Sequence, residues 1–235
     1  MPVDPALYYR NRFPAEIISH AVWLYFRFNL SHRDIEELLA ERGIQVSYEA
    51  IRLWCRKFGP ASADQLRRRQ PGPADKWHVD EMQLKLRGKK YWLWRAVDQD
   101  GFVLDMLVQE RPNEPAAVAF LRRVLAAAGG APRVIVTDKL ASYVPAAKRV
   151  LPTTEHRRHK RLNNRAENSH LPVRKRERVL QRFKSAEHAQ RFLEPFSAVC
   201  NQFRPRRHRL SAHHYREIMR DRFHTWQEVV GTACP

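Results

Sequence analysis

The strand-like stretch that begins at Trp77 carries a carboxylate where an apolar side chain would be expected. In a strand, the even-numbered residues from His78 to Leu86 share one face, and Asp80 lies in the middle of that otherwise core-like face. A carboxylate on a core face is costly unless it is paired, hydrogen-bonded or bound to a metal ion. Asp80 is therefore the first candidate for chemistry, whereas Glu81 would lie on the opposite face, in solvent.

A second acid, Asp138, directly follows the short apolar run 133–137. Such a run is typical of a buried parallel strand. Ligand sites in open α/β sheets lie outside the carboxyl ends of strands, which favours a functional role for Asp138. The alternative is that Asp138 caps a helix over 139–148, which would require no chemistry.

A third acid, Glu167, lies three positions into a helix that is expected to start near Asn163 and Asn164. One interpretation is a capping-box acid that bonds to the backbone at the start of the helix. The setting favours a different role, because the residues from Thr154 to Lys184 include eleven Lys or Arg and only three acids. Glu155, in the same segment, is the alternative third acid.

Three such acids suit one kind of chemistry. Hard divalent ions such as Mg2+ prefer carboxylate oxygens and keep open positions for a substrate phosphate. Two ions held together can assist an in-line displacement at phosphorus. Three histidines in the same region, His156, His159 and His170, are expected to contact phosphates from a basic surface rather than to bind metal.

The acids would be positioned by an α/β domain over residues 77–203. The patterns predict strands at 77–86, 91–97, 102–108 and 133–137, a strand-like run at 153–157, and a helix over 113–128. Asp98-Gln99-Asp100-Gly101 is a hairpin signal between the second and third strands. Three antiparallel strands followed by a helix and a parallel strand form a mixed α/β pattern. Residues 185–235 are expected to form one long helix whose aromatic residues pack on the sheet, with 204–235 as a basic C-terminal extension.

An all-helical module is expected to precede this domain, over residues 1–58. Helices are predicted over 15–28, from the N-cap Ser31, and over 47–58, with Gly43 in a tight turn between the last two. This arrangement resembles a helix-turn-helix whose last helix enters the major groove. A small packing or dimerisation bundle is the alternative. Residues 59–76, rich in Pro and Arg, are expected to be a linker. The DNA-binding candidates on the last helix are Ser47, Tyr48, Arg52, Arg56 and Lys57.

Composition limits the kind of partner and compartment. The formal net charge is +18 in 235 residues, which favours a polyanionic partner such as nucleic acid over a merely solvated basic surface. The three cysteines are widely spaced, so they indicate reduced thiols and neither a disulfide framework nor a zinc site. No signal-peptide pattern or membrane-span pattern is present, so a cytoplasmic protein is expected.

Three motifs, W-H-V-D-E, V-T-D-K and N-N-R-A-E-N-S-H, occur in this order, with the hairpin run Y-W-L-W-R-A-V-D after the first. At these motifs the chain resembles the DDE transposases of bacterial insertion sequences, most closely the family conventionally numbered six. The resemblance covers almost the whole chain. It implies a ribonuclease H-like mixed sheet with flanking helices, preceded by an all-α helix-turn-helix domain. It also implies that Asp80, Asp138 and Glu167 are the catalytic, metal-binding triad, with two Mg2+ or Mn2+ ions as cofactors.

The same resemblance implies the reaction and the partners. The protein would bind the terminal inverted repeats of its element, cleave the DNA and join it to target DNA, in replicative, cointegrate-forming transposition. It would act as a homodimer or larger assembly, in the bacterial cytoplasm and associated with the nucleoid. Further DNA contacts are expected from the basic residues near the acids, namely Lys139, Arg165, Arg174, Lys175 and Arg176.

Arg174, seven residues after Glu167, matches the Lys or Arg that such enzymes place one helical repeat later. Two departures concern this region: the spacing from Asp138 to Glu167 is shorter than usual in the family, and Pro172 interrupts the helix of Glu167. Two other functions fit part of the pattern. One is another ribonuclease H-like nuclease or integrase. The other is a non-catalytic DNA-binding repressor or an inactive relic.

Overall fold

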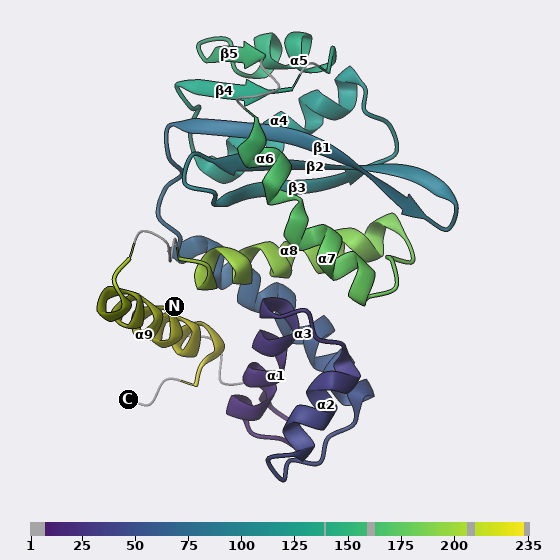
Figure 1. Cartoon of the computed structure of the whole chain (residues 1–235), viewed down its shortest axis with the longest axis vertical. Coiled ribbons are helices and arrows are strands. Elements are labelled where there is room, and N and C mark those ends of the chain that lie inside the picture. Colours follow the sequence, from purple (N-terminus) through teal and green to yellow (C-terminus); the bar gives the residue numbers. More distant parts are fainter. Residues whose placement is uncertain (1–7, 139, 159–162, 206–209, 233–235) are drawn as a thin grey trace. The chain divides into compact units, whose positions relative to one another are not determined.

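The computed structural model describes residues 8–138, 140–158, 163–205 and 210–232 (Figure 1). The chain divides into two compact units. One unit is a sheet with its helices, Pro71–Leu193, and the other is helical, Met1–Gln70 together with Glu194–Pro235. The helical unit therefore contains residues from both ends of the sequence.

The sheet unit is built on one mixed five-stranded sheet. Its strands are β1 (Lys76–Leu86), β2 (Lys89–Asp98), β3 (Val103–Gln109), β4 (Val134–Thr137) and β5 (Glu155–Arg158), in the order β3-β2-β1-β4-β5. The first three strands pair antiparallel, β4 runs parallel to β1, and β5 runs parallel to β4. The strands and their directions confirm the predicted mixed sheet, with three antiparallel strands followed by a parallel one.

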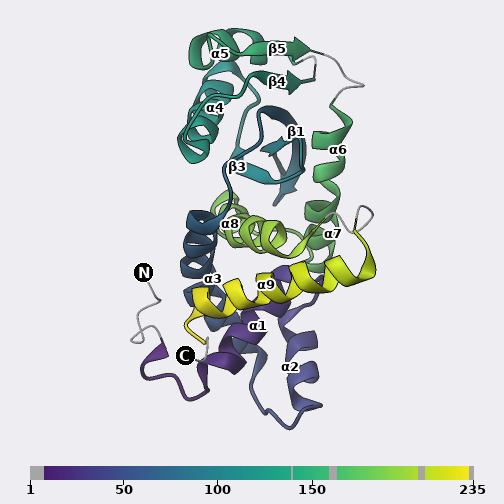
Figure 2. The same ribbon diagram turned by 90° about the vertical axis from the view of Figure 1, so that its left-hand side faces the viewer.

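Helices flank both faces of this sheet (Figure 2). On one face, α4 (Glu114–Ala128) and α5 (Tyr143–Val150) cover a core in which Trp94 packs against Phe120 and Tyr143. On the other face lies the short helix α6 (Asn164–Ser169). The central strand β1 is consequently buried on both faces over its first residues, and only from Met82 onward do buried and exposed residues alternate.

The turn chemistry explains why the strands are connected as they are. Asp98 accepts hydrogen bonds through Oδ1 from the backbone N–H groups of Asp100 and Phe102, and Gly101 has the positive φ of 86° that the turn requires. Asn113 caps α4 by accepting from Ala116 N–H, and Gly129 ends that helix in the left-handed conformation. The Asp98 turn and the extent of this helix agree with the sequence prediction.

In the helical unit, α1 (Ala15–Arg27), α2 (His32–Ala40) and α3 (Tyr48–Arg69) begin close to where they were predicted. Ser31 and Asp34 form the capping box of α2, and Ser47 caps α3 by accepting from Ala50 N–H. Gly43, between α2 and α3, has a φ of 75°. The connection between the two helices is therefore the tight turn that the sequence indicated.

The expected end of the third helix at residue 58 is wrong, because α3 continues through Gly59 and Pro60 to Arg69. A Cβ at Gly59 would lie 2.7 Å from the ring of Phe26, so the glycine is required where α1 and α3 approach closely. Buried residues beyond the proline, Ala63 and Leu66, give the helix a reason to continue despite the hydrogen bond that Pro60 removes. Most of the expected linker 59–76 is thus helical.

The expectation of one long C-terminal helix is also wrong. After α7 (Leu171–Val179), the described part of 185–235 forms two separate helices, α8 (Ala186–Phe203) and α9 (Ala212–Val230). Pro205 disfavours the helical conformation of Arg204, which explains the end of α8. Phe203 packs against Trp23, Phe223 and Trp226 of the helical unit, and therefore not on the sheet as expected. None of the helices described is long and apolar enough to cross a membrane.

Candidate functional site

The register of the parallel strands brings the first two predicted acids together. Val79 of β1 is paired with Thr137 of β4, and this is the last pair of that ladder. Asp80 and Asp138 are the next residues on the two strands, and neighbouring strands lie about 5 Å apart. Two acids far apart in the sequence therefore meet at the carboxyl end of β4, as predicted.

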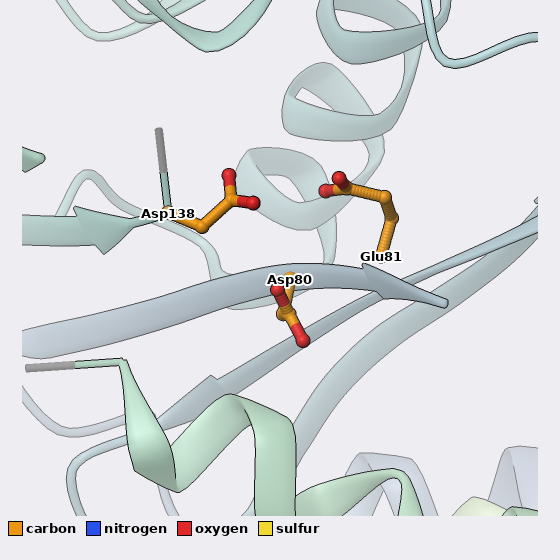
Figure 3. A group of neighbouring side chains, drawn as sticks. All are labelled: Asp80, Glu81 and Asp138. Atoms are coloured by element: carbon orange, nitrogen blue, oxygen red, sulfur yellow. The ribbon is translucent and has the colours of Figure 1, made fainter. Parts of the chain in front are cut away.

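A third carboxylate at this place was not predicted. Asp80, Glu81 and Asp138 each offer one oxygen, and these oxygens all lie within 4.8 Å of one another (Figure 3). Glu81 was expected to lie in solvent, but it is half-buried, and Tyr143 donates a hydrogen bond of 2.6 Å to its Oε2. The expectation failed because α5 covers this face of β1. The three oxygens form a hard, anionic donor set that suits a divalent cation.

Burial and the charges of neighbouring acids disfavour the charged forms of Asp80 and Glu81. The pKa of Asp80 is raised to about 7, first by burial and then by the charges of Asp138 and Glu167. The pKa of Glu81 is also raised to about 7, mainly by burial, although its hydrogen bond from Tyr143 acts in the opposite direction. A bound cation would remove this repulsion and favour the ionised carboxylates, so the residues present fit a divalent metal ion.

Glu167 belongs to α6, which lies on the face of the sheet opposite α4, and it is exposed to solvent (Figure 2). Its charge acts on Asp80, so it lies in the same electrostatic environment, although it is outside the tight group formed by Asp80, Glu81 and Asp138. The capping-box interpretation of this segment is not observed: Asn163 precedes α6 but makes no side-chain cap. Its amide donates to the backbone oxygen of Val79 at 2.9 Å.

Asp138 does not cap a helix either. Its Oδ1 accepts a hydrogen bond from Leu140 N–H at 2.9 Å, which closes a local turn. The helix that was expected over 139–148 begins only at Tyr143, and Ser142 before it makes no side-chain cap. The strand-end position of Asp138 is therefore not explained by helix capping.

The alternative third acid, Glu155, lies at the other end of the sheet. It is paired with Val134, the first residue of β4, which is four residues before Asp138, or about 13 Å along a strand. Glu155 is exposed and forms an ion pair with Arg157 at 2.7 Å. The structure therefore places Glu155 away from the group around Asp80.

Of the three histidines expected on a basic surface, His170 is buried and lies at the acids. It is 4% exposed, and its Nε2 is 3.3 Å from Oδ2 of Asp80. Burial and the nearby charge of Arg95 lower its pKa to about 3, so the ring is neutral. His156 is half-buried and its Nε2 lies 2.8 Å from Oγ1 of Thr137, while His159 lies outside the described residues. A lone histidine after a helix carries no sequence signal for such a contact.

The DNA-binding candidates of the helical unit lie together on the first turns of α3. All five of them are exposed, namely Ser47, Tyr48, Arg52, Arg56 and Lys57. Arg52 is held by Glu49 through two hydrogen bonds, and the guanidinium of Arg33 lies over the ring of Tyr48. The start of α3 therefore presents a partly pre-ordered polar and cationic surface.

The DNA-binding candidates near the acids differ in their exposure to solvent. Arg165, Arg174 and Lys175 are exposed, whereas Lys139 lies outside the described residues. Arg176 is fully buried, and its guanidinium lies over the ring of Phe192. The expectation that Arg176 contacts DNA is therefore wrong, because this face of α7 packs against α8. Pro172 ends the helical run of Glu167 as predicted and lies in the first turn of α7.

Comparison with known proteins gives a family match over the segment that contains Asp80, Asp138 and Glu167. Residues 74–206 match the family DDE_Tnp_IS240, which is described as a DDE domain. Among curated proteins, the chain is 29% identical over 203 residues to the transposase for the insertion sequence-like element IS431mec of Staphylococcus aureus, strain Mu50. It is equally similar to the transposase for IS257 in transposon Tn4003 of S. aureus. Both alignments cover 84% of this chain and 90% of the relative.

Solved structures with partial similarity include two viral integrases. One is a simian T-cell lymphotropic virus intasome in complex with PP2A regulatory subunit B56 gamma, with a TM-score of 0.45, 16% identity, and coverage of 89% of this chain and 74% of that chain. The other is the HTLV-2 integrase catalytic core domain in complex with magnesium, in its trimeric form. Its TM-score is 0.41, with 15% identity and coverage of 57% of this chain and 88% of that chain.

Proposed function

The chain belongs to the DDE domain family, as a transposase of the insertion-sequence family numbered six, and from this we propose that it binds the terminal inverted repeats of its element and catalyses metal-dependent DNA cleavage and strand transfer. The observation that carries the proposal is the meeting of Asp80 and Asp138 where the parallel pairing of β1 and β4 ends, inside the matched segment. Carboxylates gathered in this way suit phosphodiester chemistry assisted by divalent ions.

The proposed metal ligands are Asp80, Asp138 and Glu167, with Mg2+ or Mn2+ as the ion and two ions as the expected number. Bound ions would activate the attacking oxygen and stabilise the leaving oxygen of an in-line displacement. The protein's part is to hold the carboxylate of Asp80 in β1 beside that of Asp138 at the end of β4, and to keep Asp80 buried, which strengthens its interaction with a cation. The 3′ hydroxyl released by cleavage would then attack a target phosphodiester, with no covalent protein intermediate.

The proposed DNA contacts divide between the two units. The start of α3, with Tyr48, Arg52, Arg56 and Lys57, would read the inverted repeat, as expected for the second helix of a helix-turn-helix. Arg165, Arg174 and Lys175 would hold the phosphate backbone near the acids. Because an element has two ends that must react together, the proposed active form is a homodimer or larger assembly, and replicative transposition is the proposed outcome.

Strand transfer with labelled element-end DNA tests this function. The wild-type protein, supplied with Mg2+ or Mn2+, is expected to cut the labelled end and join it to target DNA. Asp138→Asn and Glu167→Gln should each abolish joined products while the affinity for element ends persists. Glu155→Gln is the matched control, since this exposed acid lies at the opposite end of the sheet and its loss should leave joining unchanged.

The same experiment separates the rival functions. Cleavage without joining by the wild-type protein would indicate a nuclease. Binding without cleavage or joining, and without dependence on a divalent ion, would indicate a repressor or an inactive relic. Joining that persists in Glu167→Gln would show that the third acid is assigned wrongly.

A further inference from the structure

The helix that carries Glu167, α6, is too short to be stable without contacts to the rest of the protein. α6 has six residues, and an isolated helix of that length is not stable in water. Its first residue is preceded by Asn163 and its last is followed by His170. Within the helix only the small side chain of Ala166 is buried and Glu167 is exposed, whereas both flanking side chains are polar and buried, so the flanking residues supply polar contacts that can fix the helix on the sheet.

Asn163 attaches the start of the helix to β1. The residue is fully buried, and its Nδ2 donates a hydrogen bond of 2.9 Å to the backbone oxygen of Val79. Val79 is in the last parallel pair between β1 and β4 and immediately precedes Asp80. The contact therefore joins α6 to the strand one residue before the central acid.

His170 attaches the end of the helix to Asp80 itself. Its Nε2 lies 3.3 Å from Oδ2 of the carboxylate, and neither ring nitrogen has a well-formed hydrogen bond with the part of the chain that the structure describes. An imidazole in such surroundings is costly to bury unless it interacts with a polar group. The carboxylate of Asp80 lies within reach of this ring, and the contact is to one of its two oxygens.

We propose that Asn163 and His170 are positioning residues that fix the Glu167 helix against Val79 and Asp80, with the contact of His170 to Oδ2 orienting the Asp80 carboxylate that would hold the cation. This inference rests on the proposed function, because it assumes a divalent ion at Asp80. Groups that orient metal-binding carboxylates commonly affect metal affinity by 10–100-fold. The role of His170 is therefore to orient a ligand, and it does not touch the reacting atoms.

Substitutions of His170 test the inference in the full-length protein, with Mn2+ as the probe and electron paramagnetic resonance as the measurement of binding. His170→Gln places an amide N–H close to the position of Nε2, whereas the shorter His170→Asn does not reach it. The Mn2+ dissociation constant is expected to rise 10–100-fold in His170→Asn and His170→Ala, and to stay within about threefold of wild type in His170→Gln. Strand transfer at limiting Mn2+ should follow the same order.

The two amide variants keep the test valid if His170→Ala fails to fold, because they differ by one methylene group and share their polarity. Equal Mn2+ affinity in wild type, His170→Asn and His170→Gln would overturn the inference, as would equal losses in both variants. The proposed function is tested separately by Asp138→Asn. If the wild type and Asp138→Asn bind Mn2+ with equal affinity, the assignment of the metal site is wrong, and so is the inference about His170.

Discussion

The hydroxyl of Tyr143, the first residue of α5, donates a hydrogen bond of 2.6 Å to Oε2 of Glu81 in the central strand β1. Tyr143 is fully buried, and its ring packs edge-on against Trp94, with 5.4 Å between the ring centroids. The residue therefore connects the core to the acids and ties the segment after Asp138 to the strand of Asp80. Four predictions follow from this and the other contacts.

Tyr143→Phe is expected to lower the free energy of unfolding by about 1–3 kcal/mol, because the half-buried carboxylate of Glu81 loses its donor. It should also weaken Mn2+ binding, since Glu81 is no longer oriented. Chemical denaturation and an Mn2+ titration measure the two effects. Tyr9→Phe is the control, because Tyr9 is 70% exposed and should show neither change. Unchanged stability in Tyr143→Phe would contradict the role given to the hydroxyl.

The stability that Asp80 and Glu81 contribute to the metal-free protein should fall as the pH rises from about 4 to about 7, whereas His170, whose pKa is lowered to about 3, acts in the opposite direction. The pKa values of Asp80 and Glu81 are both raised to about 7 in the folded chain, above the value of about 4 for unfolded carboxyls. In that window these two carboxyls bind more protons in the native state than in the unfolded state, so their contribution to the free energy of unfolding falls with increasing pH. Below pH 4 this stabilising contribution is complete, and above pH 7 it is lost.

Thermal unfolding in the presence of a chelator, at several pH values between 5 and 8, checks this dependence. Asp80→Asn should make the slope of melting temperature against pH more positive than in the wild type, and the exposed substitution Glu37→Gln should leave the slope unchanged. Added Mg2+ should restore stability most strongly at the upper end of the range, where the carboxylates are ionised. Equal slopes in the chelated wild type and in Asp80→Asn would contradict the prediction.

Two neighbours on α7 should respond differently to substitution by alanine. Lys175 is exposed, so Lys175→Ala is expected to weaken DNA binding and to reduce the slope of log affinity against log salt by about 1. Arg176 is buried over Phe192, so Arg176→Ala is expected to cost about 1–3 kcal/mol of stability instead. Fluorescence anisotropy at several salt concentrations, together with denaturation, distinguishes the two. A salt slope that changes in Arg176→Ala alone would reverse the assignment.

Gly59→Ala should destabilise the helical unit by about 1–3 kcal/mol, although alanine is ordinarily the better helix former. The new Cβ would lie 2.7 Å from the Phe26 ring, so the packing loss exceeds the gain in helix propensity. The double variant with Phe26→Leu should recover part of the loss. Gly72→Ala, where a Cβ would meet no atom within 4 Å, is the control for thermal unfolding.

Much of the sheet and of the candidate site could be predicted because the signals are local. Three patterns each predict an element from neighbouring residues alone, without knowledge of the tertiary structure. They are the alternation from Met82 to Leu86, the Asp98 turn and the apolar run before Asp138. Once β4 is known to be parallel to β1, Asp80 and Asp138 must be neighbours at the end of that ladder. The first two acids were therefore accessible from the sequence.

The remaining features depend on contacts between distant residues. Glu81 was expected in solvent because one face of a strand is commonly polar, but β1 is central and α5 covers that face as well. His170 approaches Asp80 from the end of a six-residue helix, for which no periodic signal exists. Gly59 and Pro60 predict a helix end from local propensity, and the packing of Phe26 and Leu66 overrides it.

The composition of the helical unit from both ends of the sequence has a consequence for translation. α9 contacts α3, Arg69 reaches Glu228 at 4.0 Å, and the ring of Phe223 packs on Trp23 of α1. A ribosome makes residues 1–70 first, then the whole of Pro71–Leu193, and α9 only afterwards. At a synthesis rate of about 5–20 residues per second, α9 is made at least several seconds after α1 and α3. A nascent chain can therefore complete its sheet unit while its helical unit is still unfinished.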